Sequence, residues 1–342
     1  MMKMESLSIL VIGDLHFTER SIPITNLLTP LLIKTIHERK PDLVVVLGDV
    51  LDRFGKADVQ LQSSAVRFLY EVSQLAHLLL VIGNHDIPNK TMFLTGDHGF
   101  SAVKYWKNVT IADTSCVTVK VHNRIFAAVP YVPNGRFQEA LETMKDVNLN
   151  DVTAIFAHQE FKGCDIKGNA SVEGDVWEHH RPLIISGHIH NHQWPQPNLC
   201  YVGTPYNENF GEKEIKSISL FKFFDASFLE ERIYLDVPRR VEYTCSVKEV
   251  SKWILPPNVI AKLRIVGTPA ENIAAKKFPA VRSLKAQGVT IVYEDIIDTS
   301  VRDHLAIEML NEKATPTFTD IMLNLISERD YLKGIYNEIF IE

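Results

Sequence analysis

The chain has 342 residues, of which 46% are hydrophobic and 23% charged, and its formal net charge is −6. This composition is typical of globular proteins and argues against wholesale disorder. The length suits one large domain together with a smaller one. The negative charge argues against nucleic-acid binding through a diffuse basic surface.

We expect neither a membrane helix nor an export signal in this sequence. No apolar run approaches the roughly 20 residues that a membrane helix needs. The amino terminus carries Lys3 and Glu5 ahead of a short strand and lacks the apolar stretch of a secretory signal. The four cysteines are scattered and form no C-x-x-C pair, as expected of reduced residues. We therefore expect an intracellular protein, cytoplasmic or nucleoid-associated, that is not secreted and does not contact membrane.

The first part of the chain alternates apolar runs with amphipathic stretches. Apolar runs predict buried strands at 7–12, 43–47, 78–83, 153–158 and 183–187 and shorter ones at 109–112, 116–121 and 125–132. Helical spacing predicts helices at 27–39, 60–77 and 137–145, the first preceded by a polar loop at 18–26. Strands at 217–223 and 231–237 are expected to complete a second sheet.

The sequence pattern changes near Pro238. Strands are expected at 241–247 and 259–266, a helix at 271–287 and a strand at 289–293. This β-β-α-β order spans about sixty residues, the size of a small separate domain. We therefore divide the chain into residues 1–237, 238–298 and 299–342, the last being a helical segment.

Five of the buried strands end in acids, amides or imidazoles. These polar residues are Asp14 and His16; Asp49 and Asp52; Asn84 and His85; His158; and His188 and His190. Open α/β sheets place their ligands beyond the carboxyl ends of the strands, so we expect these side chains to meet at one edge.

The residue types at these strand ends favour a pair of metal ions. Asp14 and His16 stand at positions i and i+2, so both can face one ion. Asp49 is suited to bridging, since a carboxylate has two oxygens with several lone pairs. The set contains Asp, Asn and His but no Cys, which favours manganese, iron or zinc in a catalytic site over a thiolate-rich structural zinc site.

The same residues carry a family resemblance. Asp14-x-His16, Gly48-Asp49-x-x-Asp52, Gly83-Asn84-His85-Asp86, His158 and Gly187-His188-x-His190 resemble, in order, the signature of the calcineurin-like metallophosphoesterases. Within that superfamily the chain looks most like SbcD-type nuclease subunits of double-strand-break repair. GDLH at 13–16, HQEFKG at 158–163 and YVGTPYNENFGE at 201–212 support this, and the β-β-α-β unit resembles their capping domain. Ala157 departs from the glycine of many relatives, which affects the turn and not the ligand.

The resemblance implies an α/β fold, a metallophosphoesterase β-sandwich flanked by helices, followed by the capping domain and the helical carboxyl-terminal segment. It also implies roles for the residues. One ion would be held by Asp14, His16 and His190, the other by Asn84, His158 and His188, with Asp49 bridging. Manganese is the ion expected for the nuclease branch.

In the implied reaction, water attacks phosphorus in line while both ions neutralise charge on the phosphate oxygens. His85 would protonate the leaving oxygen, and Asp52 would fix the tautomer of His85 and favour its imidazolium form. The alternative for Asp52 is a helix amino-terminal cap. Arg53 and His98 are candidate substrate contacts, and for both the alternative is a solvated surface position.

These inferences predict a metal-dependent DNA nuclease, exonuclease or endonuclease, that acts in DNA recombination, repair or replication. It would be the nuclease subunit of an SbcCD-like complex, in which an SbcC-like coiled-coil ATPase supplies DNA affinity. Apolar stripes within 316–342 would dock this ATPase, unless they pack on their own chain. A homodimer is also compatible with the resemblance. The alternatives are a metallophosphatase or phosphodiesterase with a non-DNA substrate, and a non-catalytic scaffold, against which the retained His85 and complete ligand set argue.

Overall fold

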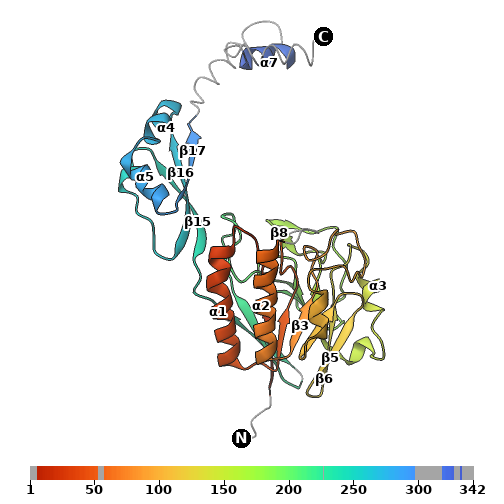
Figure 1. Ribbon diagram of the computed structural model, residues 1–342. Coiled ribbons are helices and arrows are strands. Elements are labelled where there is room, and N and C mark those ends of the chain that lie inside the picture. Colours follow the sequence, from red (N-terminus) through yellow and green to blue (C-terminus); the bar gives the residue numbers. More distant parts are fainter. Residues whose placement is uncertain (1–5, 53–57, 226, 297–317, 327–331, 333–342) are drawn as a thin grey trace. The chain divides into compact units, whose positions relative to one another are not determined.

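The computed structural model describes residues 6–52, 58–225, 227–296, 318–326 and 332 (Figure 1). Contacts divide the chain into two compact units. The larger unit comprises residues 1–243, 254–262 and 288–290, and the smaller comprises 244–253, 263–287 and 291–342. The predicted boundary between 237 and 238 therefore falls inside the larger unit.

Two six-stranded sheets form the larger unit, with strand orders β14-β13-β1-β2-β3-β4 and β11-β12-β10-β7-β6-β5. The first sheet contains β1 (Leu7–Ile12), β2 (Leu43–Val46), β3 (Leu78–Val81), β4 (Val109–Ala112), β13 (Ile218–Phe223) and β14 (Phe228–Ile233). The second contains β5 (Val117–Val121), β6 (Arg124–Val129), β7 (Val152–His158), β10 (Leu183–Gly187), β11 (Gln193–Gln196) and β12 (Leu199–Tyr201). A separate hairpin joins β8 (Asp165–Ile166) to β9 (Asn169–Ala170).

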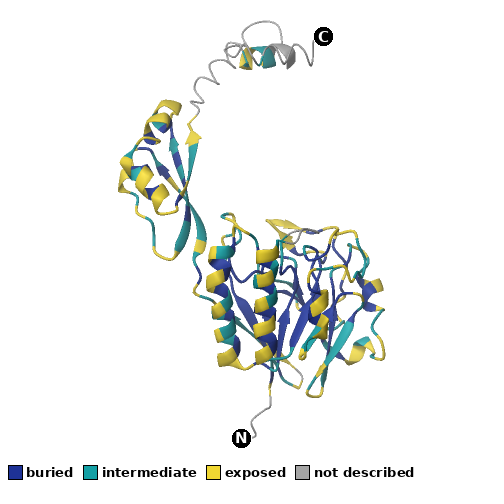
Figure 2. Cartoon of the chain, viewed as in Figure 1, coloured by how far each residue is buried: buried dark blue, intermediate teal, exposed yellow. Residues whose placement is uncertain are grey.

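Strands that are apolar throughout explain the layering of the larger unit. Along β1, Ile9 and Val11 belong to the core between the two sheets, whereas Leu10 and Ile12 belong to the core beneath the helices. Successive side chains of a strand point to opposite faces, so such a strand must be covered on both sides. Figure 2 shows the result, with buried strands and helices whose outer faces are exposed.

Helices cover the outer face of each sheet. Helices α1 (Ile22–Arg39) and α2 (Val59–Leu75) contribute Leu28, Leu32 and Phe68 to the core on the first sheet. The short α3 (Phe137–Leu141) packs against the second sheet in a core shared with Ile155 and Ile184. Short 3-10 helices lie at Ser101–Tyr105, Leu149–Asp151 and Val250–Lys252. The predicted α/β sandwich flanked by helices is confirmed.

Helix α1 begins earlier than the sequence pattern predicted. The expected polar loop at 18–26 is wrong from Ile22 onward, because Ile24 and Leu28 are both buried at helical spacing. A proline near the start suits a helix, since the first amide groups of a helix have no internal acceptor. Helix α3 also differs, ending at Leu141 and not at 145.

Parallel pairing brings the polar strand ends to one edge of each sheet. In the first sheet β1 pairs in parallel with β2, with Val11 opposite Val45, and β2 pairs in parallel with β3. In the second, β7 and β10 run parallel with Gly187 opposite His158. The residues that follow these strands therefore lie level with one another, as the sequence predicted.

The three-stranded sheet β15-β16-β17 carries the β-β-α-β pattern. Its strands are β15 (Arg239–Ser246), β16 (Val259–Gly267) and β17 (Thr290–Asp295). The helix expected at 271–287 is two helices, α4 (Pro269–Ala275) and α5 (Pro279–Ala286). Pro279 explains the break, since it has no amide hydrogen to continue α4. Thr268 and Glu271 start α4 with a reciprocal capping box.

Little of the carboxyl-terminal segment can be compared with its prediction. Helix α7 (Phe318–Leu325) lies within the predicted helical region 299–342. The rest of that segment, and with it most of the proposed ATPase-docking region, falls outside the described residues. Among the helices that the structure describes, none combines the length and apolar character needed to cross a membrane.

Candidate metal centre

Two loops bring Asp14, His16 and His190 together. Asp14 and His16 follow β1, and His190 follows β10. Their candidate ligand atoms all lie within 4.8 Å of one another, and Nε2 of His16 is 3.9 Å from Oδ2 of Asp14. Asp14 and His16 are buried and His190 is half-buried. These are the three residues predicted for the first ion.

A second group comprises Asp49, Asn84, His158 and His188. Oδ1 of Asn84 lies 3.0 Å from Nε2 of His158 and 2.9 Å from Nδ1 of His188. Oδ2 of Asp49 lies 3.3 Å from Nε2 of the same His158. The residues come from the ends of β2, β3, β7 and β10, so both sheets contribute to one cluster.

Asp49 lies between the two groups. Its Oδ2 atom is 3.3 Å from Nε2 of His158 in the second group and 3.8 Å from Nε2 of His16 in the first. The other oxygen, Oδ1, accepts a hydrogen bond from the backbone N–H of His85 at 2.8 Å. This hydrogen bond orients the carboxylate, and the arrangement fits the bridging role predicted for Asp49.

Three of the predicted ligands have left-handed backbone conformations. The φ angles are 42° at His16, 45° at Asp49 and 78° at His188. Residues with a Cβ atom rarely adopt positive φ, and each such conformation costs roughly 1–3 kcal/mol. Here it turns the chain sharply at the strand end, so that the side chain faces the cluster.

Glycines leave room for the ligands at two of the strand ends. A Cβ atom on Gly187 would lie 2.5 Å from Oδ1 of Asp14 and 2.7 Å from the carbonyl oxygen of Leu47. A Cβ atom on Gly83 would lie 2.3 Å from Oδ1 of Asp49. The glycines of the GHIH and GNHD strings therefore permit a close approach of backbone to ligand.

The hydrogen bonding of His158 fits a bound cation. Nδ1 of His158 lies 2.6 Å from the carbonyl oxygen of Leu47, which can only accept, so Nδ1 carries the hydrogen. In the neutral ring the lone pair of Nε2 then faces Oδ1 of Asn84 and Oδ2 of Asp49. Three acceptors directed at one another are unfavourable unless a proton on Nε2 or a metal ion lies among them. Both ring nitrogens of His16 are likewise buried without a hydrogen-bond partner.

The pKa shifts of the histidines show that the carboxylates make this cluster electrostatically negative. Burial disfavours a charged His158, but Asp49 and Asp14 outweigh burial and raise its pKa to about 9. Burial opposes charge on His16 too, and the neighbouring carboxylates raise that pKa to about 10. At His188 burial prevails, and His158 adds to it, so the pKa falls to about 3. The carboxylates of the cluster therefore stabilise positive charge, which suits divalent metal ions.

His85 and Asp52 lie beside the metal groups. Oδ1 of Asp52 is 3.3 Å from Nδ1 of His85 and 3.3 Å from Nδ1 of His16. The side chain of His85 is 27% exposed, so a substrate can reach it. Asp52 favours the imidazolium form of His85, in the expected direction, but its attraction is not the largest influence on that ring. Burial lowers the pKa of His85, and this outweighs the attraction of the carboxylates.

Of the two predicted substrate contacts, the structure describes only His98. Arg53 lies outside the described residues. The side chain of His98 is fully buried, and its Nε2 atom is 3.0 Å from Oδ2 of Asp113. Nδ1 of His98 accepts a hydrogen bond from the backbone N–H of Phe100. This burial argues against the predicted contact of His98 with substrate.

The sequence reasoning missed two glutamates at the site. Glu208 has one carboxylate oxygen 3.3 Å from Nε2 of His16 and the other 3.4 Å from Nδ1 of His190. Oε1 of Glu212 lies 3.5 Å from the same Nδ1 of His190. A carboxylate that accepts from Nδ1 of His190 leaves Nε2 of His190 for a metal, whereas Glu208 faces the same Nε2 of His16 that faces Asp14 and Asp49. Both glutamates lie in the YNENFGE string that follows β12, so the rule of polar residues after strands would have found them.

Asp86 is a third residue to which sequence reasoning assigned no role. It is buried, and its carboxylate accepts hydrogen bonds from the backbone N–H groups of Leu51 at 3.1 Å and Gly83 at 3.0 Å. These two bonds join the loop after β2 to the loop after β3. Asp86 thereby fixes the relative positions of Asp49 and Asn84.

Comparison with known proteins agrees with this site. The calcineurin-like phosphoesterase family matches residues 7–192, the stretch that holds every predicted metal ligand. A protein of Invertebrate iridescent virus 3 named as phosphoesterase 078R is 35% identical over 322 residues, covering 92% of this chain and 90% of its own length. Phosphoesterase 244L of Invertebrate iridescent virus 6 is 34% identical over 267 residues, covering 77% of this chain and 94% of its own length.

A solved structure, the protein AQ665 from Aquifex aeolicus, has a TM-score of 0.26 and 15% identity over 46% of this chain and 83% of its own, too weak a likeness to support any argument. The family match and the viral relatives are sufficient without it. Together with the metal groups, they show that the chain belongs to the calcineurin-like phosphoesterases, hydrolases of phosphoric esters that use divalent metal ions.

Proposed function

We propose that this phosphoesterase is a DNA nuclease that uses two divalent ions, manganese by its resemblance to SbcD-type enzymes. The observation that carries the proposal is the pair His85 and Asp52, whose Nδ1 and Oδ1 atoms lie 3.3 Å apart and whose side chains are both partly exposed. The sugar oxygen that leaves when DNA is cleaved is a poor leaving group and needs a proton. A partly exposed histidine outside the ligand set is suited to deliver it.

We assign the following roles to the residues of the site. Asp14, His16 and His190 would hold one ion and Asn84, His158 and His188 the other, with Asp49 between them. Bound ions supply charge neutralisation at the phosphate and lower the pKa of water. His85 would then hold a proton at the leaving oxygen, while Asp52, whose Oδ1 is 3.3 Å from Nδ1 of His85, would orient the ring and keep the other ring nitrogen available.

The sequence strings HQEFKG and YVGTPYNENFGE and the sheet β15-β16-β17 with α4 and α5 support the nuclease among other phosphoesterase activities. They resemble the corresponding parts of SbcD-type subunits. The net charge of −6 opposes unaided DNA binding, because affinity for DNA comes largely from phosphate contacts with cationic side chains. An SbcC-like ATPase would supply the missing affinity.

Purified protein with manganese, incubated with end-labelled single-stranded and duplex DNA, tests the proposal. We expect fragments or released nucleotides, and loss of all cleavage with Asp49→Asn. A matched reaction with p-nitrophenyl phosphate, a monoester, separates the alternatives. Rapid monoester turnover without DNA cleavage would identify a phosphatase, and absence of turnover on any ester at saturating manganese would identify a scaffold.

The ATPase partner is proposed from resemblance and has its own test. Removal of residues 299–342 should leave hydrolysis of a small phosphodiester unchanged, because every proposed ligand precedes residue 191. It should abolish co-purification with the ATPase and stimulation of cleavage at duplex ends. A truncated protein that unfolds would show that the segment stabilises its own chain, and one that still binds the ATPase would place docking elsewhere.

A further inference from the structure

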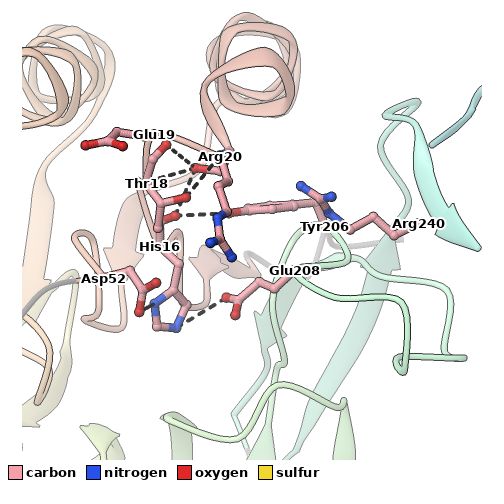
Figure 3. Close-up of a pocket in the computed structure, with 9 residues that line it drawn as sticks. His16, Thr18, Glu19, Arg20, Asp52, Tyr206, Glu208 and Arg240 are labelled. Carbon is pink, nitrogen blue, oxygen red and sulfur yellow. Dashed lines mark hydrogen bonds and ion pairs between the residues drawn. The ribbon is translucent and has the colours of Figure 1, made fainter. Parts of the chain in front are cut away.

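A pocket beside the metal groups contains two arginines that the proposed chemistry does not use (Figure 3). The pocket has a volume of about 340 Å³, and its lining includes His16, Glu208, Arg20 and Arg240. Pockets that take small ligands typically measure roughly 300–1,000 Å³. All its lining residues belong to the larger compact unit. The pocket thus adjoins a predicted ligand of the first ion and is large enough for part of a substrate.

The two arginines come from different elements and face this one cavity. Arg20 precedes α1, and Figure 3 shows its side chain directed towards Glu208 and His16. Nε of Arg240 in β15 donates to the carbonyl oxygen of Asn207 at 3.2 Å, which restrains the guanidinium. Among the residues that the structure describes, neither arginine forms an ion pair with a carboxylate. Their charges are therefore available to an anionic ligand.

Three acids line the pocket: Figure 3 shows Glu19 directed away from the guanidinium of Arg20, and the other two face histidine. Asp52 and Glu208 each have a carboxylate oxygen 3.3 Å from a ring nitrogen of His16. Ser21, the amino-terminal cap of α1, also borders the pocket, and the first turn of α1 has no acidic residue. Pro23 has no amide hydrogen and the amide of Ile24 donates to the carbonyl oxygen of Ser21, so the helix dipole, more than free amide groups, favours an anion at this end. The side of the pocket formed by the arginines and α1 is therefore its anion-binding side.

We propose that Arg20 and Arg240 bind a second phosphate of the substrate, adjacent to the phosphate that is hydrolysed. Guanidinium groups present paired N–H donors that match phosphate oxygens, and such charge-assisted bonds are among the strongest hydrogen bonds. The inference rests on the proposed function, since a DNA strand carries a phosphate on each side of the scissile one. It makes a neighbouring phosphate a determinant of substrate choice.

Two pairs of chromogenic diesters test the inference. One pair is the p-nitrophenyl ester of thymidine 5′-phosphate with and without a 3′-phosphate, and the other is the corresponding pair built on thymidine 3′-phosphate. In at least one pair, we expect kcat/KM to be about 10- to 100-fold higher for the substrate with two phosphates, the range expected for hydrogen bonds to charged groups.

The variants assign this preference to the pocket. Arg20→Ala and Arg240→Ala should each reduce it about tenfold while leaving kcat/KM on the single-phosphate substrate within about twofold. Arg20→Lys should retain part of it. Arg67→Ala on α2 and Arg239→Ala beside Arg240 remove exposed arginines outside the pocket and should retain all of it. Equal rates within both pairs, or a preference that survives both pocket variants, would overturn the inference.

A binding measurement keeps this result separate from the proposed function. If no diester is hydrolysed, the proposed function fails, and calorimetry with thymidine 3′,5′-bisphosphate decides the inference alone. Binding at least about tenfold tighter than that of either monophosphate, lost with Arg20→Ala and Arg240→Ala, would support the pocket. Equal binding of bisphosphate and monophosphates would contradict it.

Discussion

Nδ1 of His158 donates a hydrogen bond to the carbonyl oxygen of Leu47 at 2.6 Å, joining residues 111 positions apart in the chain. His158 ends β7 of the second sheet, and Leu47 follows β2 of the first. The bond therefore ties the two sheets together at their ligand-bearing edge. It also fixes the ring so that Nε2 faces Asn84 and Asp49, which makes a single tautomer of His158 part of the metal site.

Asp49→Asn should abolish metal-dependent hydrolysis, by a factor on the order of a hundred or more, because it removes the carboxylate placed between the two groups. Metal content after gel filtration, measured by elemental analysis, should fall below that of the wild type. Asp97→Asn, at an exposed loop position, is the matched control and should behave as wild type. Near wild-type turnover of Asp49→Asn at limiting manganese would show that the site is wrongly assigned.

Gly187→Ala should impair the site although it removes no ligand. The added Cβ atom would lie 2.5 Å from Oδ1 of Asp14 and 3.0 Å from Nδ1 of His158, so both side chains must shift. We expect metal affinity to fall by about 10- to 100-fold, as for loss of a residue that orients ligands. Titration of manganese by electron paramagnetic resonance measures this. Gly96→Ala, whose Cβ atom would first meet a methyl group at 3.4 Å, should leave affinity unchanged.

His85→Ala should separate metal binding from chemistry. Both ions should remain bound, while cleavage of DNA slows by a factor on the order of a hundred, typical for loss of a general acid. The loss should be much smaller for a nitrophenyl diester, since nitrophenolate leaves without a proton. Equal losses on both substrates, measured as kcat/KM, would rule out this role for His85.

Asp113 should give the fold an acid-sensitive contribution to stability. Burial would raise the pKa of Asp113, but hydrogen bonds from His98 and Lys104 outweigh burial and lower it to about 2 from an ordinary 3.8. A carboxyl group with a lowered folded pKa stabilises the fold above its unfolded pKa and loses that contribution as the pH falls through the folded pKa.

Because the folded pKa of Asp113 is lowered, removing its charge should matter most above pH 4. Asp113→Asn should lower the free energy of unfolding by about 1–2 kcal/mol at pH 6, after allowing for solvent screening. The difference from wild type should shrink steadily below pH 4. Urea unfolding at several pH values measures it, and Asp97→Asn should show no such trend. A difference that stays constant from pH 6 to pH 3 would contradict the assignment.

The sequence alone was sufficient to predict the β-sandwich and the candidate metal ligands. Runs such as Leu43–Leu47 are apolar at every position, which is typical of a strand covered on both sides, and each polar string follows such a run directly. Because parallel strands align their carboxyl ends, residues as distant as Asp14 and His188 could be placed at one edge from pattern alone.

Other features depend on tertiary contacts that periodicity does not encode. His98 sits in a loop of turn-forming residues, and such a loop predicts an exposed side chain. In the folded chain this side chain is buried and paired with Asp113, which follows β4. The start of α1 looked polar because Thr25 and Asn26 interrupt its apolar spacing, while burial of Ile24 against the sheet decides the outcome. Arg20 and Arg240 lie more than two hundred residues apart, and only the folded chain shows that they share a pocket.

The left-handed turns at His16, Asp49 and His188 bear on how this chain would change if the reaction were no longer needed. Each position holds a side chain where glycine would relieve backbone strain of roughly 1–3 kcal/mol. Selection for stability alone would therefore replace these ligands first, and glycine is the expected replacement. Residues that reduce stability at three separate turns persist only while selection for a role other than stability retains them.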